Sequence, residues 1–405
     1  SRNWSRSSGC ECAHVLIWRM LPISPNRCFN IADLRRLARL KLPAPMFHYM
    51  DGGADDEWTL KHNTRAFERL TVAPRQLRDI SQIDLRTKVL GSEIALPFFL
   101  APTGMSRLFH HQAEPAVARA AARFGTLYSL STLGTTSIET IAKASDGPKM
   151  FQIYILKDRG LTEEFVERCR DARYSALCLT VDAALAGNRE RDHRTGMVMP
   201  PRLTPGSLIS FGLHPYWTFN LLRNPDFKLA NVEHRVDALS KGAISLIEYL
   251  NTQLDRSVTW EDVAWLRARW SGPLCLKGIQ HPEDVRQAVA LGVDAVMLSN
   301  HGGRQLDGAP APIDCVKPAR DLVGDAIELI VDGGIRRGTH VLKALAMGAD
   351  ACSIGRGYLF GLAAGGEQGV MRALNLLRAE TERSFALAGC RSVAEARAHE
   401  VTRLD

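Results

Sequence analysis

Residues 295–303 read AVMLSNHGG, an apolar run that ends abruptly in Ser, Asn, His and two glycines. An apolar run without alternating polar positions is typical of a parallel strand that is covered on both faces. Most of seven further runs have the same form: FFLAPTG (98–104), LYSLST (127–132), FQIYI (151–155), ALCLTVD (176–182), LCLKG (274–278), LIVDGG (329–334) and ACSIGRG (351–357). The sequence therefore repeats one unit, a buried strand followed by polar or glycine residues.

Segments rich in Ala, Leu, Arg and Glu separate most of these runs, for example AEPAVARAAARFG (113–125) and EDVRQAVALG (283–292). The second segment follows Pro282 and ends on Gly292, residues that helix termini favour. Eight strands that alternate with helices predict a (β/α)8 TIM barrel, an α/β fold that suits a chain of 405 residues. The alternative is a doubly wound open sheet, but APTGMS (101–106) is a poor candidate for its usual glycine-rich first turn.

Three segments depart from the repeat. Residues 1–30 are rich in Ser and Arg, and we expect them to be a disordered or non-native extension before a barrel domain over 31–405. Residues 31–70 precede the first predicted strand and have a helical pattern, so the barrel carries an N-terminal helical extension. The connection after the fourth strand contains a long loop, 200–235, which is rich in aromatic residues and interrupted by Pro205 and Pro215. Long loops of this kind are usually functional.

The composition narrows the classes of partner. A net charge of +7 suits an anionic ligand or an anionic membrane surface. The Lys and Arg residues are scattered rather than clustered, so no nucleic-acid partner is expected. Nine cysteines, several of them within apolar runs, indicate reduced thiols in a cytoplasmic protein. None has a His at metal-ligand spacing, and no metal site is expected.

His301 and Arg304 follow the sixth predicted strand, within SNHGGRQLDG (299–308). An imidazole can act as a general base near neutral pH, and a guanidinium can bind a carboxylate through two parallel hydrogen bonds. The intervening Gly302 and Gly303 let the chain turn tightly enough for both side chains to reach one substrate. The pair indicates proton removal next to a carboxylic acid, unless both side chains simply hydrogen-bond the loop itself.

Other strand ends add charge to the same mouth of the barrel. Asp182 ends the fourth strand and could orient His301, while Arg189 follows in GNRERD, a stretch that taken alone is usually a solvated charge run. Lys277 ends the fifth strand, where a buried cation needs an anionic or carbonyl partner. VDGGIRRG (331–338) and SIGRG (353–357) end the last two strands, where barrels often bind phosphate, and Arg336 and Arg356 add positive charge there.

Together, SNHGGRQLDG, VDGGIRRGTHVLKALAMGA, LTVDAALAGNRERD, APTGM and YMDGGADDEWTL resemble the FMN-dependent L-2-hydroxy acid oxidising family. That family includes glycolate and lactate oxidases, L-lactate and mandelate dehydrogenases, and the flavin domain of flavocytochrome b2. The resemblance runs in order from about residue 31 to the end of the sequence, and no single motif carries it.

The resemblance implies a role for each matching residue. His301, held by Asp182, takes a proton from the substrate as two electrons pass to FMN, either as a hydride or through a carbanion. Tyr49, Arg189 and Arg304 bind the carboxylate, Tyr154 hydrogen-bonds the hydroxyl or keto oxygen, and Lys277 stabilises negative charge on the reduced flavin. The remaining residues hold the cofactor: Pro102, Thr103, Ser131, Gln152, Thr180 and Ser299 along the isoalloxazine and ribityl chain, and Asp332, Gly334, Arg336, Gly355 and Arg356 at the ribityl and phosphate groups.

The resemblance also implies a substrate and partners. Leu133 stands where glycolate oxidases tend to have Trp, which favours L-lactate over a two-carbon acid. Electrons are expected to pass to a quinone or a cytochrome, and a homo-oligomer, in particular a tetramer, is expected. The segment 200–235 resembles the loop of bacterial lactate and mandelate dehydrogenases, which are peripheral membrane proteins. Its Phe211, Tyr216, Trp217 and Phe219, with Arg223 and Lys228 nearby, are predicted to contact the inner face of the cytoplasmic membrane, unless the segment is only a lid over the barrel.

Three other functions compete with this interpretation. An oxidase would pass the electrons to O2 and form hydrogen peroxide. Another FMN barrel, such as flavin-dependent isopentenyl diphosphate isomerase, has a diphosphate substrate that explains neither Arg189 nor the pair formed by His301 and Arg304. A non-catalytic barrel that only binds flavin or phosphate would not need His301, Arg304 and Arg189 together with Asp182.

Overall fold

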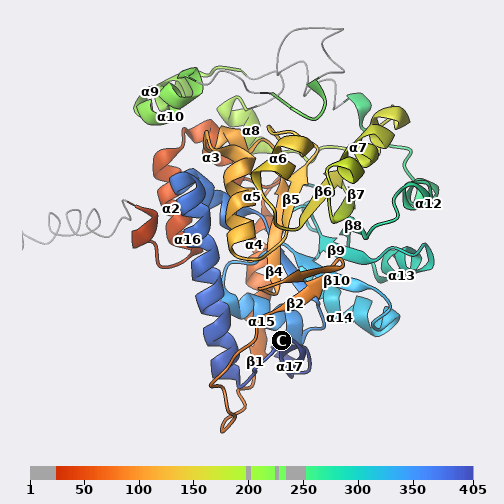
Figure 1. Cartoon of the computed structure of the whole chain (residues 1–405). Coiled ribbons are helices and arrows are strands. Elements are labelled where there is room, and N and C mark those ends of the chain that lie inside the picture. The colour runs from red at the N-terminus through yellow and green to blue at the C-terminus, as the bar shows by residue number, and fades with distance from the viewer. Residues whose placement is uncertain (1–23, 198–201, 224–227, 234–251, 405) are drawn as a thin grey trace, which may run out of the picture.

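Eight parallel strands form a closed barrel in a computed structural model of the chain, which describes residues 24–197, 202–223, 228–233 and 252–404 (Figure 1). The strands are β4 (Phe98–Thr103), β5 (Tyr128–Ser131), β6 (Lys149–Ile153), β7 (Ala176–Thr180), β8 (Leu274–Ile279), β9 (Ala295–Ser299), β10 (Glu328–Asp332) and β11 (Ala351–Ile354). The barrel closes where β11 pairs with β4, through Cys352 opposite Phe98 and Ile354 opposite Leu100. All eight predicted strands are confirmed, and the open-sheet alternative is excluded.

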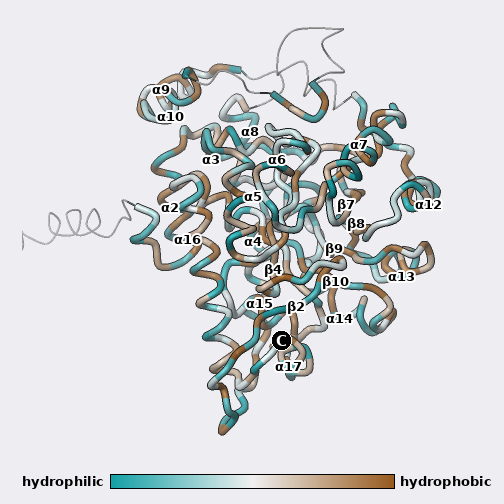
Figure 2. Tube along the Cα trace, viewed as in Figure 1, coloured by the Kyte–Doolittle hydropathy of each residue, from teal (hydrophilic) through white to brown (hydrophobic). Residues whose placement is uncertain are grey.

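Helices cover the outside of the barrel between successive strands, and most hydrophobic residues lie on the strands and on the inner sides of these helices (Figure 2). They are α5 (Ala113–Arg123), α6 (Ile138–Ala144), α7 (Arg159–Asp171), α12 (Trp260–Arg269), α13 (Pro282–Ala290), α14 (Pro312–Val323), α15 (Gly338–Ala346) and α16 (Arg356–Ala388). Several begin with a side-chain cap, such as Asp158 on the Leu161 amide and Ser137 on the Thr140 amide. The helix predicted over 283–292 is α13, which begins at Pro282 as expected.

A hairpin closes one end of the barrel. It consists of β2 (Thr87–Val89) and β3 (Ser92–Ile94), and its Val89, Leu90 and Ile94 belong to the same buried cluster as the side chains inside the barrel. The Leu90 amide donates to the Glu328 carboxylate over 2.8 Å, which ties the hairpin to the start of β10. The carboxyl ends of the strands therefore form the open mouth, where (β/α)8 barrels carry their sites.

The N-terminal extension is helical, as predicted. It contains α2 (Ile31–Lys41), α3 (Ala44–Asp51), α4 (Trp58–Arg65) and the short 3-10 helix η2 (Ala66–Arg69). Residues 1–23 of the expected disordered extension lie outside the described residues. Residues 24–30 pack on the domain instead: Cys28 is fully buried, and its carbonyl accepts a hydrogen bond from Arg372 over 2.7 Å. The folded domain therefore begins before residue 31.

The connection between β7 and β8 contains α8 (Glu190–Thr195), α9 (Pro205–Leu213) and α10 (Pro215–Arg223). The last two form a helical hairpin at the edge of the molecule, beside α3 and above α2 (Figure 1). Trp217 is buried and donates its indole N–H to the Leu108 carbonyl over 2.8 Å, and Phe211 stacks on it. The prediction that Trp217 contacts the membrane is therefore wrong, because its ring fixes the hairpin to the barrel, while Phe211 is half-buried against it. No helix in the described part of the chain has the length and hydropathy needed to cross a membrane.

Candidate active site

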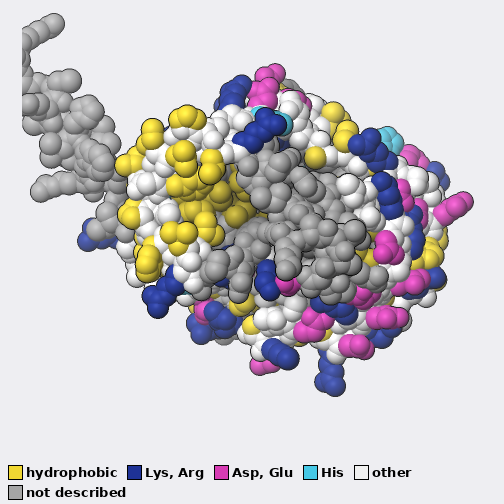
Figure 3. Space-filling view, turned by 90° about the horizontal axis from the view of Figure 1, so that it is seen from above, with side chains coloured by type: hydrophobic (Ala, Val, Ile, Leu, Met, Phe, Trp, Pro, Cys, Tyr) yellow, Lys and Arg dark blue, Asp and Glu magenta, His cyan; other side chains and the backbone are white. Residues whose placement is uncertain are grey.

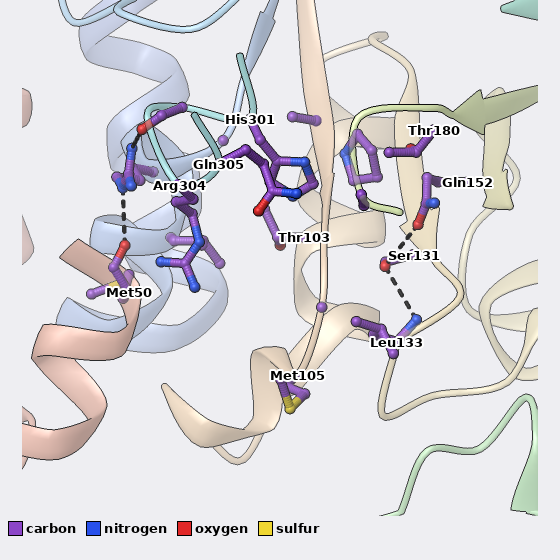
Figure 4. Close-up of a pocket in the computed structure, with 18 of the residues that line it drawn as sticks. Met50, Thr103, Met105, Ser131, Leu133, Gln152, Thr180, His301, Arg304 and Gln305 are labelled. Atoms are coloured by element: carbon purple, nitrogen blue, oxygen red, sulfur yellow. Dashed lines mark hydrogen bonds between the residues drawn. The ribbon is translucent and has the colours of Figure 1, made fainter. Parts of the chain in front are cut away.

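A cavity of about 680 Å³ occupies the open mouth of the barrel. Its lining contains sixteen of the eighteen predicted site residues: Tyr49, Pro102, Thr103, Ser131, Gln152, Tyr154, Thr180, Arg189, Lys277, His301, Arg304, Asp332, Gly334, Arg336, Gly355 and Arg356. Asp182 and Ser299 lie just behind this lining, bonded to residues within it. Figure 4 shows His301, Arg304 and Gln305 on one side of this pocket and Ser131, Gln152 and Thr180 on the other.

His301 lies directly after β9 in a left-handed conformation, with φ of +56°. Such a backbone is costly for a residue other than glycine and persists only where the surroundings hold it. Here the His301 amide donates to Ser299 Oγ over 3.1 Å. Two residues on, Gly303 is also left-handed, and a Cβ atom there would lie 2.5 Å from the Leu60 amide nitrogen. Only glycine therefore permits the close approach of α4 to this turn.

Asp182 orients the His301 ring through a contact of 3.0 Å between its Oδ1 and His301 Nδ1. Burial raises the pKa of Asp182, but the positive charges of His301 and Lys277 outweigh that effect and bring the pKa below its ordinary value. An ionised carboxylate only accepts hydrogen bonds, so Nδ1 carries a hydrogen. In the neutral ring the lone pair is then on Nε2, the nitrogen that a general base uses.

Lys277 forms a buried ion pair with Asp332, with 3.0 Å between Nζ and Oδ2. Ser299 lies between them: its Oγ accepts from Lys277 over 3.1 Å and donates to Asp332 over 2.7 Å. Burial lowers the pKa of Lys277, but Asp332 and Asp182 outweigh it and raise the pKa above its ordinary value. A permanent positive charge therefore lies in the lining of the cavity.

Two arginines approach the ring of Tyr49 at the side of the cavity nearest α3. The Arg304 guanidinium lies 5.0 Å and that of Arg189 5.6 Å from the ring centroid. Arg304 donates to the Tyr49 carbonyl over 2.6 Å, and burial and the charge of Arg189 lower its pKa. Arg189 pairs with Asp192 over 3.2 Å, and burial raises the pKa of this carboxyl group. Two half-buried cations beside one weakened carboxylate favour an anionic ligand.

The opposite wall presents polar atoms that lack partners. Ser131 Oγ donates to Gln152 Oε1 over 3.0 Å and accepts from the Leu133 amide over 3.2 Å. Among the described residues, the buried atoms Gln152 Nε2 and Thr180 Oγ1 have no hydrogen-bond partner. Buried polar groups are nearly always paired, so these two point to a polar ligand along this wall. An isoalloxazine ring, with its carbonyl oxygens and ring nitrogens, fits that requirement.

The far end of the cavity has the features of an anion site. Burial lowers the pKa of Arg336 to about 10, and burial with the charges of Arg304 and Arg336 lowers that of Arg356 to about 9. Gly355 precedes α16 without a side-chain cap, so the first amides of that helix are available to an anion. Arg356 donates three hydrogen bonds to the carbonyls of Met50, Gly302 and Gly52, which leaves two of its five N–H groups. The residues present therefore fit a phosphate group as well as a flavin ring, as FMN requires.

Two hydrogen-bonded connections in this region did not follow from the sequence. The Gln305 side chain donates to the Asp182 and Leu185 carbonyls and accepts from the Gly187 amide, and so holds the loop after β7 against the turn after β9. Asn300 and Asn63 exchange two side-chain hydrogen bonds of 2.7 Å, which join the same turn to α4. The turn after β9 is therefore fixed from two sides by amide side chains.

This chain is similar to known proteins in both sequence and structure. The family described as FMN-dependent dehydrogenase matches residues 38–403. An L-lactate oxidase from a Nostoc species is 44% identical over 365 residues, which cover 89% of this chain and 94% of that protein. Glycolate oxidase 1 from Zea mays is 40% identical over 378 residues, 93% of this chain and 96% of that protein. The crystal structure of the monotopic membrane protein (S)-mandelate dehydrogenase superposes with a TM-score of 0.89 at 35% identity, covering 93% of this chain and 99% of that one.

Proposed function

This chain belongs to the FMN-dependent dehydrogenase family, and from that premise we propose that it oxidises L-lactate to the 2-keto acid and passes the electrons to a quinone or a cytochrome. Its relatives act on the CH–OH group of 2-hydroxy acids, and FMN is the cofactor of the family. The observation that carries the proposal is the oriented pair of His301 and Asp182, which faces one cavity together with Arg304 and Arg189.

In this proposal the substrate carboxylate lies between Arg304 and Arg189, close to Tyr49, where two half-buried guanidinium groups compensate its charge. The Tyr154 hydroxyl hydrogen-bonds the oxygen that becomes the keto group; burial raises the pKa of this phenol, so it stays protonated and can donate. His301 Nε2 removes the substrate proton, and Asp182 stabilises the imidazolium that results. Binding of the carboxylate, orientation of the substrate oxygen and removal of the proton therefore fall to different side chains.

FMN, when bound, supplies the acceptor for the two electrons of the substrate. Gln152 and Thr180 would hold its ring along with Pro102, Thr103 and Ser131, and Lys277 would place a positive charge beside it. Arg336, Arg356 and the amides at the start of α16 would hold its phosphate. Ser299 would act indirectly in this arrangement, by positioning Lys277 and Asp332.

A larger substrate is a second candidate, because part of the cavity wall is apolar. Leu133, Met105, Leu156, Met197 and Leu254 line it. A wall of flexible Met and Leu side chains can enclose an apolar group larger than the methyl of lactate. An aromatic 2-hydroxy acid such as (S)-mandelate is therefore the alternative to L-lactate.

Anaerobic reduction of the flavin by a panel of L-2-hydroxy acids tests the substrate and the acceptor in turn. We expect L-lactate to bleach the flavin with a higher kcat/KM than glycolate or (S)-mandelate, and a quinone to reoxidise it faster than O2 does. Preference for (S)-mandelate would favour the second candidate. Stoichiometric hydrogen peroxide, with no gain in rate when quinone is added, would show instead that the enzyme is an oxidase.

Replacement of Arg304 by lysine is expected to raise KM for L-lactate about 10- to 100-fold, because a point charge cannot replace two parallel hydrogen bonds to a carboxylate. Steady-state kinetics with L-lactate measures this effect. The matched control is Arg194→Lys, since Arg194 is exposed on α8 and pairs with Glu190 in its own helix. An unchanged KM in the Arg304 variant would remove this residue from the carboxylate site.

The membrane contact that we propose involves the apolar face of the hairpin formed by α9 and α10. Leu208, Ile209, Leu213, Phe219 and Leu222 are each more than half exposed. They gather as a hydrophobic patch on one side of the surface seen from above the barrel mouth (Figure 3). Exposed apolar patches of this kind mark interaction surfaces, and amphipathic helices of this composition bind the bilayer interface. The inner face of the cytoplasmic membrane remains our proposed location.

The triple variant Leu208→Ser, Leu213→Ser and Phe219→Ser is expected to lower binding to phosphatidylcholine–phosphatidylglycerol vesicles roughly 100-fold. Each side chain removed contributes on the order of 1 kcal/mol at an interface. Vesicle co-sedimentation measures the change. Serine at Leu77, Leu387 and Leu404, which are exposed elsewhere, is the matched control and should not reduce binding. An equal loss of vesicle binding in the two triple variants, or no loss in either, would contradict a membrane role for the hairpin.

A further inference from the structure

A second cavity, of about 590 Å³, lies outside the barrel between α10, α2 and α16. Trp217 and Asn220 of α10 line it, with Lys41 from the end of α2 and His110 and His111 from the segment after β4. None of these side chains belongs to the lining of the cavity in the barrel mouth. The proposed chemistry of L-lactate oxidation leaves this second cavity unexplained.

The two cavities share one aromatic side chain. Phe109 lines both of them and is almost fully buried. Its ring stacks on Tyr49, with 6.4 Å between the centroids and 24° between the planes. The second cavity therefore lies directly behind an aromatic wall of the active site.

The second cavity also adjoins the apolar face of the hairpin. Tyr216 lines the cavity and is 68% exposed, next to the exposed Phe219 on the same helix. Trp217, the next residue, is fixed by its bond to the Leu108 carbonyl. One short helix, α10, thus contributes both to the surface proposed to meet the bilayer and to the wall of the second cavity.

The polar groups of the second cavity are suited to a neutral ligand that accepts hydrogen bonds and gains negative charge when it is reduced. Lys41 donates to the Ala364 carbonyl over 2.5 Å, and an ammonium group has further N–H donors. Glu367 is neutralised by Arg119 and Arg123, at 2.8 and 2.9 Å. Burial lowers the pKa of His110 to about 4, so this ring is uncharged at neutral pH.

We propose that this cavity binds the head group of a lipid-soluble quinone, which makes it the acceptor site of the enzyme. The inference rests on the proposed function. The quinone ring would pack against Trp217 and Phe109, and its oxygens would accept hydrogen bonds from Lys41 and from the histidine ring N–H groups. In the balanced reaction the 2-hydroxy acid loses two electrons and two protons to become the 2-keto acid. The quinone gains two electrons and two protons to become the quinol, and the flavin returns to its oxidised form.

Photolabelling of the FMN-loaded enzyme with an azido derivative of decylubiquinone tests the position of the site. We expect the label on α10 or on residues 108–112, with loss of labelling when unmodified decylubiquinone competes. Asn220→Trp, which fills the cavity, should lower both labelling and decylubiquinone reduction at least about tenfold. Its matched control is Phe219→Trp, which adds the same side chain one residue away on the exposed face. Lys41→Met is a second variant and should lower labelling without filling the cavity.

Anaerobic bleaching of the flavin by L-lactate and the reduction of ferricyanide should stay within about twofold in all three variants, since none of the three residues lines the cavity in the barrel mouth. Labelling within the barrel mouth, or full quinone reduction by Asn220→Trp, would overturn the proposal. Competition by a short-chain phosphatidylglycerol but not by decylubiquinone would identify a lipid head-group site and overturn it as well. Failure of every 2-hydroxy acid to bleach the flavin would instead refute the proposed function, because labelling does not require turnover.

Discussion

Replacement of His301 by glutamine is expected to leave FMN bound and to slow the bleaching of the flavin by L-lactate about 10³- to 10⁴-fold. A positioned general base contributes an effect of that size. Glutamine keeps a polar side chain beside Asp182 but has no basic nitrogen. Stopped-flow absorbance under anaerobic conditions measures the rate, and the flavin content of the purified variant reports FMN binding.

The conformation of His301 calls for a second variant. Its φ of +56° is unfavourable for glutamine, whereas asparagine adopts left-handed backbone more readily. His301→Asn should therefore be as slow as His301→Gln while it keeps the turn intact. A normal bleaching rate in either variant would show that His301 is not the base. Recovery by asparagine alone would show that the turn, rather than the imidazole, limits the rate.

The barrel could be predicted because each strand is buried on both faces and therefore lacks alternating polar positions. The beginning of β6 shows the limit of that signal. The strand starts at Lys149, two residues before the predicted run, and this lysine is buried. Its Nζ donates to the Ser145 and Gly147 carbonyls, both over 2.6 Å. A charge that is satisfied by local carbonyls cannot be distinguished in the sequence from a surface lysine.

The candidate site could be predicted where its residues follow a strand end, since strand ends of a closed barrel meet at one mouth. His301 follows β9, Thr180 is the last residue of β7, and Lys277 lies two residues before the end of β8. Gln305 and Asn63 were not predicted, because they act through hydrogen bonds to segments far away in the sequence. Nothing in their local pattern separates them from other amide residues in loops.

The hairpin of α9 and α10 shows what an aromatic-rich segment does not reveal. Its composition predicted a surface that binds something, but not which rings face outward. Trp217 faces inward because its indole N–H has a partner in the Leu108 carbonyl, and leucine and isoleucine form most of the exposed face instead. The direction of the Trp217 ring thus depends on one hydrogen bond to a distant segment.

Lys277→Met is expected to lower the free energy of unfolding by about 3–5 kcal/mol, because it leaves the buried carboxylate of Asp332 without its partner. Urea unfolding with saturating FMN measures this loss. The matched control is Lys317→Met, which breaks an exposed ion pair with Asp321 and should change stability by less than about 1 kcal/mol. A loss as small as that of the control would mean that Asp332 is stabilised without Lys277.

The double variant Lys277→Met and Asp332→Asn separates the ion pair from simple loss of packing. Removing both charges should raise the free energy of unfolding by about 2 kcal/mol or more relative to Lys277→Met, since Asp332 no longer leaves an unpaired buried charge. Burial alone would lower the pKa of Lys277, but Asp332 and Asp182 raise it above the ordinary 10.5. The stabilisation is therefore fully present below about pH 10 and is lost only as the pH rises through the raised pKa. The difference in the free energy of unfolding between wild type and Lys277→Met should accordingly be the same at about pH 6 and about pH 9. A difference that shrinks between these two pH values would show that the two carboxylates do not hold the lysine in its charged form.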